Sequence, residues 1–152
     1  MEADTSIQES DEQGYPLGTA GRGLLAAVGL LLIAGFGLAA AVQPDPRGYG
    51  THQQFGFPAC GFFVLFGIPC PSCGSTTAFA SFVRGRWWFA AQANFAAFLL
   101  ALTCAGLVPW SLSSAWRGRL WRVTDPARSL AWLVIALASV SLLQWGVRLA
   151  AR

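Results

Sequence analysis

Residues 23–42 read GLLAAVGLLLIAGFGLAAAV, a stretch without any charged side chain. About 20 apolar residues are what an α-helix needs to cross ~30 Å of hydrocarbon at ~1.5 Å per residue. Arg22 precedes the stretch and Pro44 follows it closely, so polar or helix-breaking residues bound it on both sides. A buried helix of a soluble protein is usually shorter, so we predict a transmembrane helix. Three glycines in it would allow another helix to approach closely: Gly29, Gly35 and Gly37.

Two later stretches have the same character, at about 87–112 and 129–147. The first is bounded by tryptophans, as helices often are where they meet the two surfaces of a membrane. Only 11% of the chain is charged, against roughly 25% in a typical soluble domain. We therefore predict an all-α integral membrane protein with about three transmembrane helices, in contact with the lipid bilayer.

The chain divides into a tail and one membrane domain. Residues 1–21 are polar and acidic and lack apolar periodicity, so we predict a disordered tail, followed by a single membrane domain over 22–152. The acidic start does not fit a signal peptide, which needs a basic segment before its apolar core. Arginines are dense in the link 113–128, which favours a cytoplasmic N-terminus and an outward-facing loop over 43–86.

The distribution of ionisable residues excludes several classes of function. No carboxylate lies between Asp45 and Asp125, and His52 is the only histidine. General acid–base catalysis and a Ser-His-Asp site are therefore not expected in the middle of the chain. The chain also lacks a basic run interleaved with aromatic residues, so we expect no binding to nucleic acid.

The loop over 43–86 holds three of the four cysteines, Cys60, Cys70 and Cys73, with the spacing C-x9-C-x2-C. The apolar segment between Cys60 and Cys70 is too short to span a bilayer, so we predict a re-entrant or interfacial segment. After the CPSCG turn, hydroxyl residues that can cap a helix precede apolar residues at helical spacing. We therefore predict a short helix over 75–84 that lies near the membrane surface.

One interpretation of the cysteine cluster is a metal site. CPxCG is the turn of zinc knuckles, in which the proline shapes the turn and the glycine lets backbone N–H groups approach the thiolates. Cys70 and Cys73 would supply two ligands, Cys60 a third, and His52 is the only histidine available as a fourth. On this interpretation Cys60, Cys70, Cys73 and His52 are the metal ligands, and zinc is a candidate for the metal.

Two other interpretations remain open. Cys70 and Cys73 could form a redox pair at a helix N-terminus, in a membrane thiol oxidase linked to a quinone. Such enzymes usually have a second cysteine pair, which here would combine Cys60 with Cys104, a residue midway along a predicted span. Alternatively, the cysteines form a structural disulfide or pack as thiols. Cys104 alone is best explained as a small apolar packing residue.

Residues 60–98 resemble a family of bacterial membrane proteins, the domain of unknown function 2752. The family pattern is a cysteine, about nine residues, CPxCGxTR, a glycine-containing turn and an Asn-Pro that enters a helix. The matching residues here are Cys60, Gly67, Cys70, Pro71, Cys73, Gly74, Thr76, Gly85 and Asn94. Three positions depart from the pattern: Thr77 replaces the arginine, Arg86 replaces an acidic residue, and Phe95 replaces the proline. The resemblance implies a small multi-helix protein of a bacterial inner membrane, and no reaction.

From these observations we expect a non-enzymatic accessory or assembly subunit of a membrane complex. Its cysteine loop would form a rigid docking element, and its glycine and aromatic helix faces would contact other membrane subunits. The alternative is a membrane thiol-disulfide oxidoreductase that uses Cys70 and Cys73.

Overall fold

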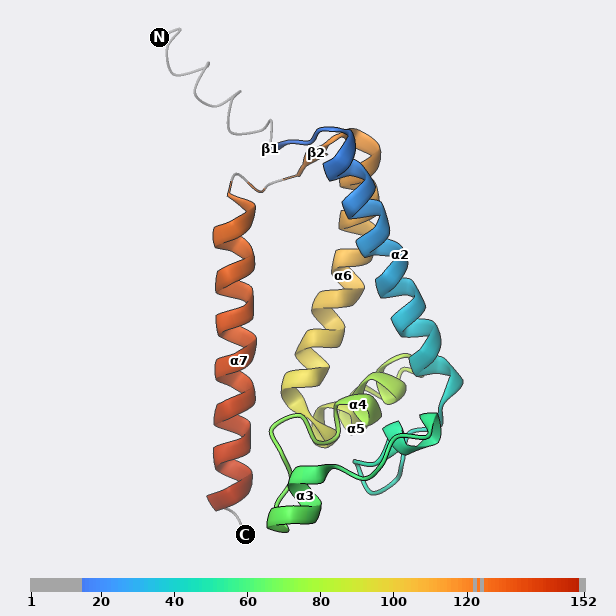
Figure 1. Cartoon of the computed structure of the whole chain (residues 1–152), viewed down its shortest axis with the longest axis vertical. Coiled ribbons are helices and arrows are strands. Elements are labelled where there is room, and N and C mark those ends of the chain that lie inside the picture. The colour runs from blue at the N-terminus through green and yellow to red at the C-terminus, as the bar shows by residue number, and fades with distance from the viewer. Residues whose placement is uncertain (1–14, 122, 124, 151–152) are drawn as a thin grey trace, which may run out of the picture. The chain divides into compact units, whose positions relative to one another are not determined.

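The computed structural model of the chain describes residues 15–121, 123 and 125–150. The elements follow one another along the chain as shown in Figure 1. They are β1 (Tyr15–Pro16), α2 (Thr19–Ala41), η1 (Thr51–Phe55, a 3-10 helix), α3 (Gly61–Phe66), α4 (Ser75–Phe82), α5 (Trp87–Ala93), α6 (Phe95–Arg117), β2 (Arg119–Leu120) and α7 (Pro126–Ala150). The prediction of an almost entirely helical protein is confirmed.

Three helices, α2, α6 and α7, are long and apolar enough to cross a membrane. They have 23, 23 and 25 residues, which matches the thickness of a bilayer core. Large apolar side chains on them are exposed, for example Leu31 and Leu143, both at 71%. Such side chains are stable in hydrocarbon and costly in water, so these helices identify a membrane protein in contact with lipid.

The first helix begins earlier than the boundary that the sequence suggested. The structure starts α2 at Thr19 and pairs β1 with β2 in an antiparallel ladder, with Tyr15 opposite Leu120. The backbone N–H of Leu17 donates to the carbonyl of Gly118 at 2.9 Å. These bonds join residues about 100 positions apart, which composition does not reveal. Residues 1–14 of the predicted tail lie outside the described residues.

The second predicted span, 87–112, is corrected by the structure. It is two helices, α5 and α6, separated at Asn94, whose backbone is extended (φ −161°, ψ 108°). The Asn94 side-chain oxygen accepts the backbone N–H of Ala97 at 3.0 Å and so caps α6. Pro109 lies inside α6, and the helix continues to Arg117. The residues of the third predicted span, 129–147, all lie inside α7.

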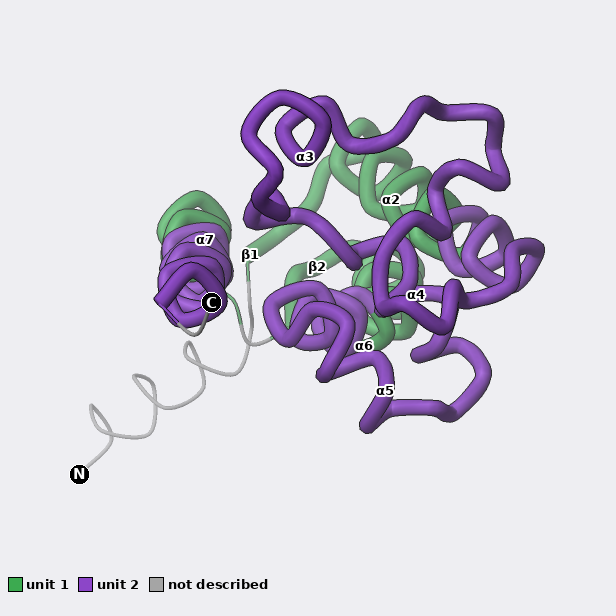
Figure 2. Tube along the Cα trace, turned by 90° about the horizontal axis from the view of Figure 1, so that it is seen from below, with its two compact units in different colours: residues 1–33, 105–133 green, residues 34–104, 134–152 purple. Residues whose placement is uncertain are grey.

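The described chain forms two compact units, coloured in Figure 2. One unit takes in the chain up to Ile33 and Ala105–Leu133. Within it, α2 and α6 approach closely at Gly29, where a Cβ atom would lie only 2.7 Å from the Leu112 side chain. Arg22 Nε donates to the Ala115 carbonyl at 2.8 Å, which satisfies a carbonyl near the end of α6.

The other unit takes in Ala34–Cys104 and Val134–Arg152 and contains all four cysteines. Its core is made of small residues: Ala78, Ala90, Ala93 and Ala97, with Phe79, Phe82 and Phe98 packed around them. Alanines let α4 and α5 approach closely, and α4 confirms the short helix predicted after the CPSCG turn. Arg84 Nη2 donates to the Ala40 carbonyl at 2.9 Å and so fastens α4 to the end of α2. The position of α4 near the membrane surface stays a prediction.

Candidate metal centre

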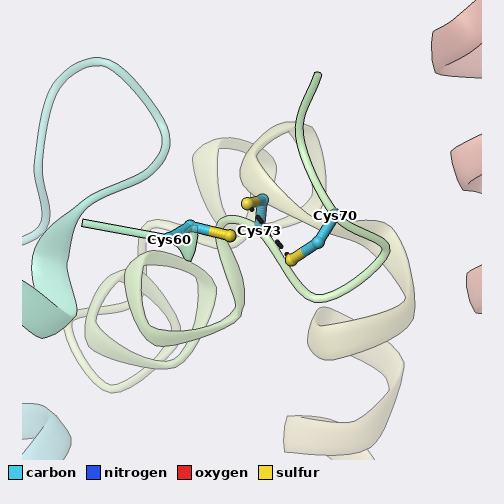
Figure 3. Close-up of side chains that lie close together, drawn as sticks. All are labelled: Cys60, Cys70 and Cys73. Atoms are coloured by element: carbon cyan, nitrogen blue, oxygen red, sulfur yellow. Dashed lines mark hydrogen bonds between the residues drawn. The ribbon is translucent and has the colours of Figure 1, made fainter. Parts of the chain in front are cut away.

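Three sulfur atoms meet at the N-terminal ends of two short helices. Cys60 immediately precedes α3, and Cys70 and Cys73 lie in the turn before α4. The three Sγ atoms lie within 4.8 Å of one another, and those of Cys70 and Cys73 are 3.3 Å apart. Figure 3 shows the three side chains pointing toward one another. All three thiols are half-buried and none is in a disulfide.

The turn between Cys70 and Cys73 follows from its sequence. The backbone N–H of Cys73 donates to the carbonyl of Cys70 at 3.0 Å, which is the bond that closes a β-turn. Pro71 occupies the second position of this turn, where its fixed φ is favourable. The next residue, Gly74, has φ +91°. A Cβ atom there would collide with the carbonyl oxygen of Ala93 and lie 2.7 Å from that of Gly48, so only glycine fits without strain.

Side chains from distant helices hold the carbonyl groups of this turn. Asn94 Nδ2 donates to the carbonyls of Pro71 and Cys73, both at 3.1 Å. Trp145 Nε1, from α7, donates to the carbonyl of Pro69 at 2.8 Å. The carbonyls of every second residue from Pro69 to Cys73 are thus hydrogen-bonded, two by Asn94 and one by Trp145. These bonds hold the backbone that carries Cys70 and Cys73 in place.

Arg148, one turn after Trp145 in α7, also contacts backbone carbonyls at the cysteine turn and at the end of α5. Its Nη2 donates to the Ala93 carbonyl at 2.6 Å, and its Nη1 lies 3.4 Å from the Cys73 carbonyl. A carbonyl at the end of α5 has no partner inside the helix, so the arginine satisfies it. The guanidinium also brings a positive charge beside Cys73, and carbonyl partners do not neutralise it.

Sequence reasoning missed these supporting residues. Trp145 lies near the end of the predicted span 129–147 and Arg148 directly after it, and both act about 75 residues away in sequence. Asn94 had been noted as a polar residue near a helix start. An asparagine inside an apolar run is a signal for such a break, because its side chain competes for backbone hydrogen bonds.

The local environment shifts the pKa values of Cys60 and Cys73 in opposite directions. The pKa of Cys60 is lowered to about 7, first because its sulfur accepts a hydrogen bond from the Phe63 backbone N–H, and also through hydrogen bonds with Cys73 and Cys70. The pKa of Cys73 is raised to about 12, first by burial and then by its hydrogen bonds with Cys70 and Cys60, which favour its protonated form. The metal-free cluster therefore holds a partly ionised thiol beside a protonated one at neutral pH.

A cavity of about 820 Å³ adjoins the three cysteines. Its wall includes Cys60, Cys70, Cys73, His52, Arg47 and Arg148. His52 is thus close to the cluster, but its nitrogens are not among the donor atoms that lie within 4.8 Å of one another. Its Nε2 is bonded instead to the Pro58 carbonyl at 3.1 Å.

The threonine at position 77 takes part in a buried contact beside the cavity. Thr77 is fully buried, and its hydroxyl lies 2.8 Å from that of Thr51, which also accepts the backbone N–H of Asp45 at 2.9 Å. This pair of threonines fastens η1 to α4. The departure from the family pattern at Thr77 therefore has a packing role next to the cavity.

The sulfur spacing is close to that of a metal site. With Zn–S bonds of about 2.3 Å, two sulfurs of a tetrahedral site lie about 3.8 Å apart. The Cys70–Cys73 distance of 3.3 Å is somewhat shorter than this value, and no distance among the three sulfurs exceeds 4.8 Å. Thiolates prefer soft or borderline metals such as zinc and Cu(I). The structure thus brings together three of the four predicted ligands, leaves His52 on the cavity wall, and does not include Cys104 in the cluster.

A comparison with known protein families matches the segment that contains this cluster. No curated protein and no solved structure matches the chain. A family model does match, over residues 60–108, which include Cys60, Cys70, Cys73 and Asn94. That family is described as protein of unknown function DUF2752, so the resemblance is confirmed over this cysteine-bearing segment.

Proposed function

We propose that the protein is a metal-binding membrane protein whose Cys60, Cys70 and Cys73 thiolates hold one zinc ion. The convergence of the three sulfurs within 4.8 Å supports this most directly, because they come from two separate turns of the chain. The hydrogen bonds that hold the cysteine turn are also typical of a metal site. Asn94 and Trp145 fix the backbone that carries the ligands, as outer-shell groups of metal centres do.

The role that fits this centre is that of a non-enzymatic accessory or assembly subunit in a bacterial inner membrane. The zinc would crosslink Cys60 at the start of α3 to the turn before α4 and so stiffen the loop over 43–86. That loop presents a largely apolar surface on α3, where Val64 is 68% and Leu65 is 78% exposed. A stiff apolar loop fits a docking element for another membrane subunit, with the N-terminus on the cytoplasmic side.

The test is to purify the full chain in mild detergent without reductant or chelator and to measure bound metal and free thiols together. We expect about one zinc per chain, as three clustered thiolates would hold, and thiols that resist alkylation until a chelator is added. Cys60→Ser should lower the zinc content strongly, whereas Cys104→Ser, which removes the cysteine outside the cluster, should leave it unchanged. Absence of zinc, with all thiols freely alkylated, would rule out the metal centre.

One observation favours a second function, thiol–disulfide oxidation. The Cys70 and Cys73 sulfurs are 3.3 Å apart, so a disulfide could form with a small movement. In that reaction the two thiols lose two protons and two electrons, the S–S bond forms, and a quinone takes up the electrons and protons to become a quinol. Two thiols that stay hidden until reductant is added, together with quinone reduction that Cys70→Ser abolishes, would favour this function over the metal centre.

A further inference from the structure

We propose that the metal ion held by Cys60, Cys70 and Cys73 keeps an open coordination position on the cavity side, and that this position takes an anionic donor from outside the chain. This inference rests on the proposed metal centre and names the class of ligand that the centre binds.

The first argument is the number of ligands. Structural zinc sites are closed by four protein ligands, whereas sites with three protein ligands keep a position for an exogenous donor. In the part of the chain that the structure describes, no histidine, carboxylate or fourth cysteine joins the three thiols within 4.8 Å. The three sulfurs line the cavity of about 820 Å³, so the remaining position has space in front of it.

The second argument is the state of His52. A carbonyl oxygen can only accept, so His52 Nε2 must donate to the Pro58 carbonyl and carries the ring proton. His52 also lies in η1, between Gly50 and Gly56, which both have left-handed backbone conformations and bound the short helix tightly. The bond anchors the ring through Nε2, and although Nδ1 keeps its lone pair, the ring nitrogens are not among the donor atoms that lie within 4.8 Å of one another.

The third argument is charge. Among the residues that the structure describes, the arginines that line the cavity are Arg47 and Arg148, and no carboxylate lines it. Arg47 is paired with Asp45 at 2.7 Å, but the described hydrogen bonds of Arg148 go to uncharged carbonyls, including that of Cys73. A divalent ion with three thiolates has a net charge of −1, which Arg148 offsets. An anion therefore approaches a locally neutral centre, which without Arg148 would repel it.

The anionic donor can come from two sources with the same chemistry. One is a small inorganic anion in solution. The other is a carboxylate or thiolate side chain of a partner subunit that enters the cavity. Either would complete a four-coordinate site without any further ligand from this chain.

The experiment uses the full chain in detergent, loaded with Co²⁺ in place of zinc, because the visible spectrum of Co²⁺ reports its ligands. We expect azide to shift the spectrum saturably, and His52→Ala to bind azide with unchanged affinity. If the wild-type spectrum ignores azide while His52→Ala responds to it, His52 is the fourth ligand and the inference is wrong. Failure to bind Co²⁺ or zinc at all would instead contradict the proposed metal centre.

A pair of variants tests the role of charge. Arg148→Gln should weaken azide binding about tenfold, whereas Arg148→Lys, which keeps the charge, should restore most of the affinity. Equal azide affinity in Arg148→Gln and wild type, or stronger binding of neutral imidazole than of azide, would overturn the preference for an anion. The Co²⁺ affinity of both variants, measured first, shows that the thiolate site itself is intact.

The source of the donor is found by repeating the azide titration in membrane extracts in which the protein keeps its neighbours. A response equal to that of the purified chain indicates a small anion. A response that appears only after purification indicates a partner side chain. Both results support the open position.

Discussion

The side-chain amide of Asn94 donates to the carbonyl oxygen of Cys73 at 3.1 Å, and the two residues lie 21 positions apart. The same amide nitrogen donates to the Pro71 carbonyl, while the amide oxygen caps α6 through the Ala97 N–H. One buried side chain thus ends α5, starts α6 and fixes the turn between Cys70 and Cys73. The geometry of the thiol cluster therefore depends on a break in a membrane-associated helix.

Asn94→Ala should reduce both stability and metal binding. It leaves buried carbonyls without donors and removes a helix cap, which together cost about 1–3 kcal/mol. Thermal unfolding in detergent and zinc content measure the two effects. Asn94→Asp keeps the capping oxygen but loses both donated bonds, so it should lower zinc content as much as the alanine does. Gln92→Ala, at an exposed position on α5, is the control. Normal zinc content in Asn94→Ala would contradict the role of this side chain.

Gly74→Ala should disrupt the cysteine turn more than an equivalent change elsewhere. Its Cβ atom would meet the carbonyl oxygens of Ala93 and Gly48, and neither backbone can move easily. Gly85 provides a matched control, because it has φ +71° but open space around its missing Cβ. Gly85→Ala should cost only the left-handed backbone penalty of roughly 1–2 kcal/mol. Gly74→Ala should cost more and should also lower zinc content, and equal losses of stability in the two variants would contradict the steric argument.

In metal-free protein, Cys60 should be the thiol that iodoacetamide modifies first. The thiolate is the nucleophile, and the pKa of Cys60 is lowered to about 7, so its reaction rate should rise with pH and level off above about 7. The pKa of Cys73 is raised to about 12, so Cys73 should stay protonated and slow throughout this range. Mass spectrometry of the peptides after short labelling at pH 6, 7 and 8 follows each residue. Faster labelling of Cys73 than of Cys60 would contradict the assignment.

Long apolar segments were readable from the sequence, whereas the contacts that build the site were not. The three membrane helices follow from length and composition, because a bilayer imposes a fixed thickness on any helix that crosses it. The proximity of Cys70 and Cys73 follows from the CPSC turn. The meeting of Cys60, at the start of α3, with this turn has no local signature. The bonds from Trp145 and Asn94 that hold the turn act over many residues and have none either. His52 was included only because the chain has one histidine, and its bond to Pro58 comes from the fold of the loop.

Arg84 should matter for stability much more than its neighbour Arg86. The guanidinium of Arg84 donates to the carbonyls of Ala39, Ala40 and Ala80, and so satisfies the end of α2. Arg86 instead has its guanidinium 4.8 Å from the Phe89 ring centre, an exposed contact worth roughly 0.5–1 kcal/mol. Arg84→Gln should lower the unfolding temperature in detergent clearly, and Arg86→Gln only slightly. Equal effects would show that the carbonyl bonds of Arg84 contribute little.

Gly29 should prove more sensitive to substitution than Gly35, although both lie in the same apolar stretch. A Cβ atom at Gly29 would lie 2.9 Å from the Ser111 hydroxyl and 2.7 Å from the Leu112 side chain, where α2 and α6 pack together. At Gly35 the same atom would meet nothing within 4 Å. Overpacking a close helix contact costs roughly 1–3 kcal/mol, and in a membrane small residues are what allow such contacts. Gly29→Val should therefore destabilise the protein in detergent. Gly35→Val should change stability little, because its side chain enters lipid or detergent and leaves the contact between α2 and α6 as it was.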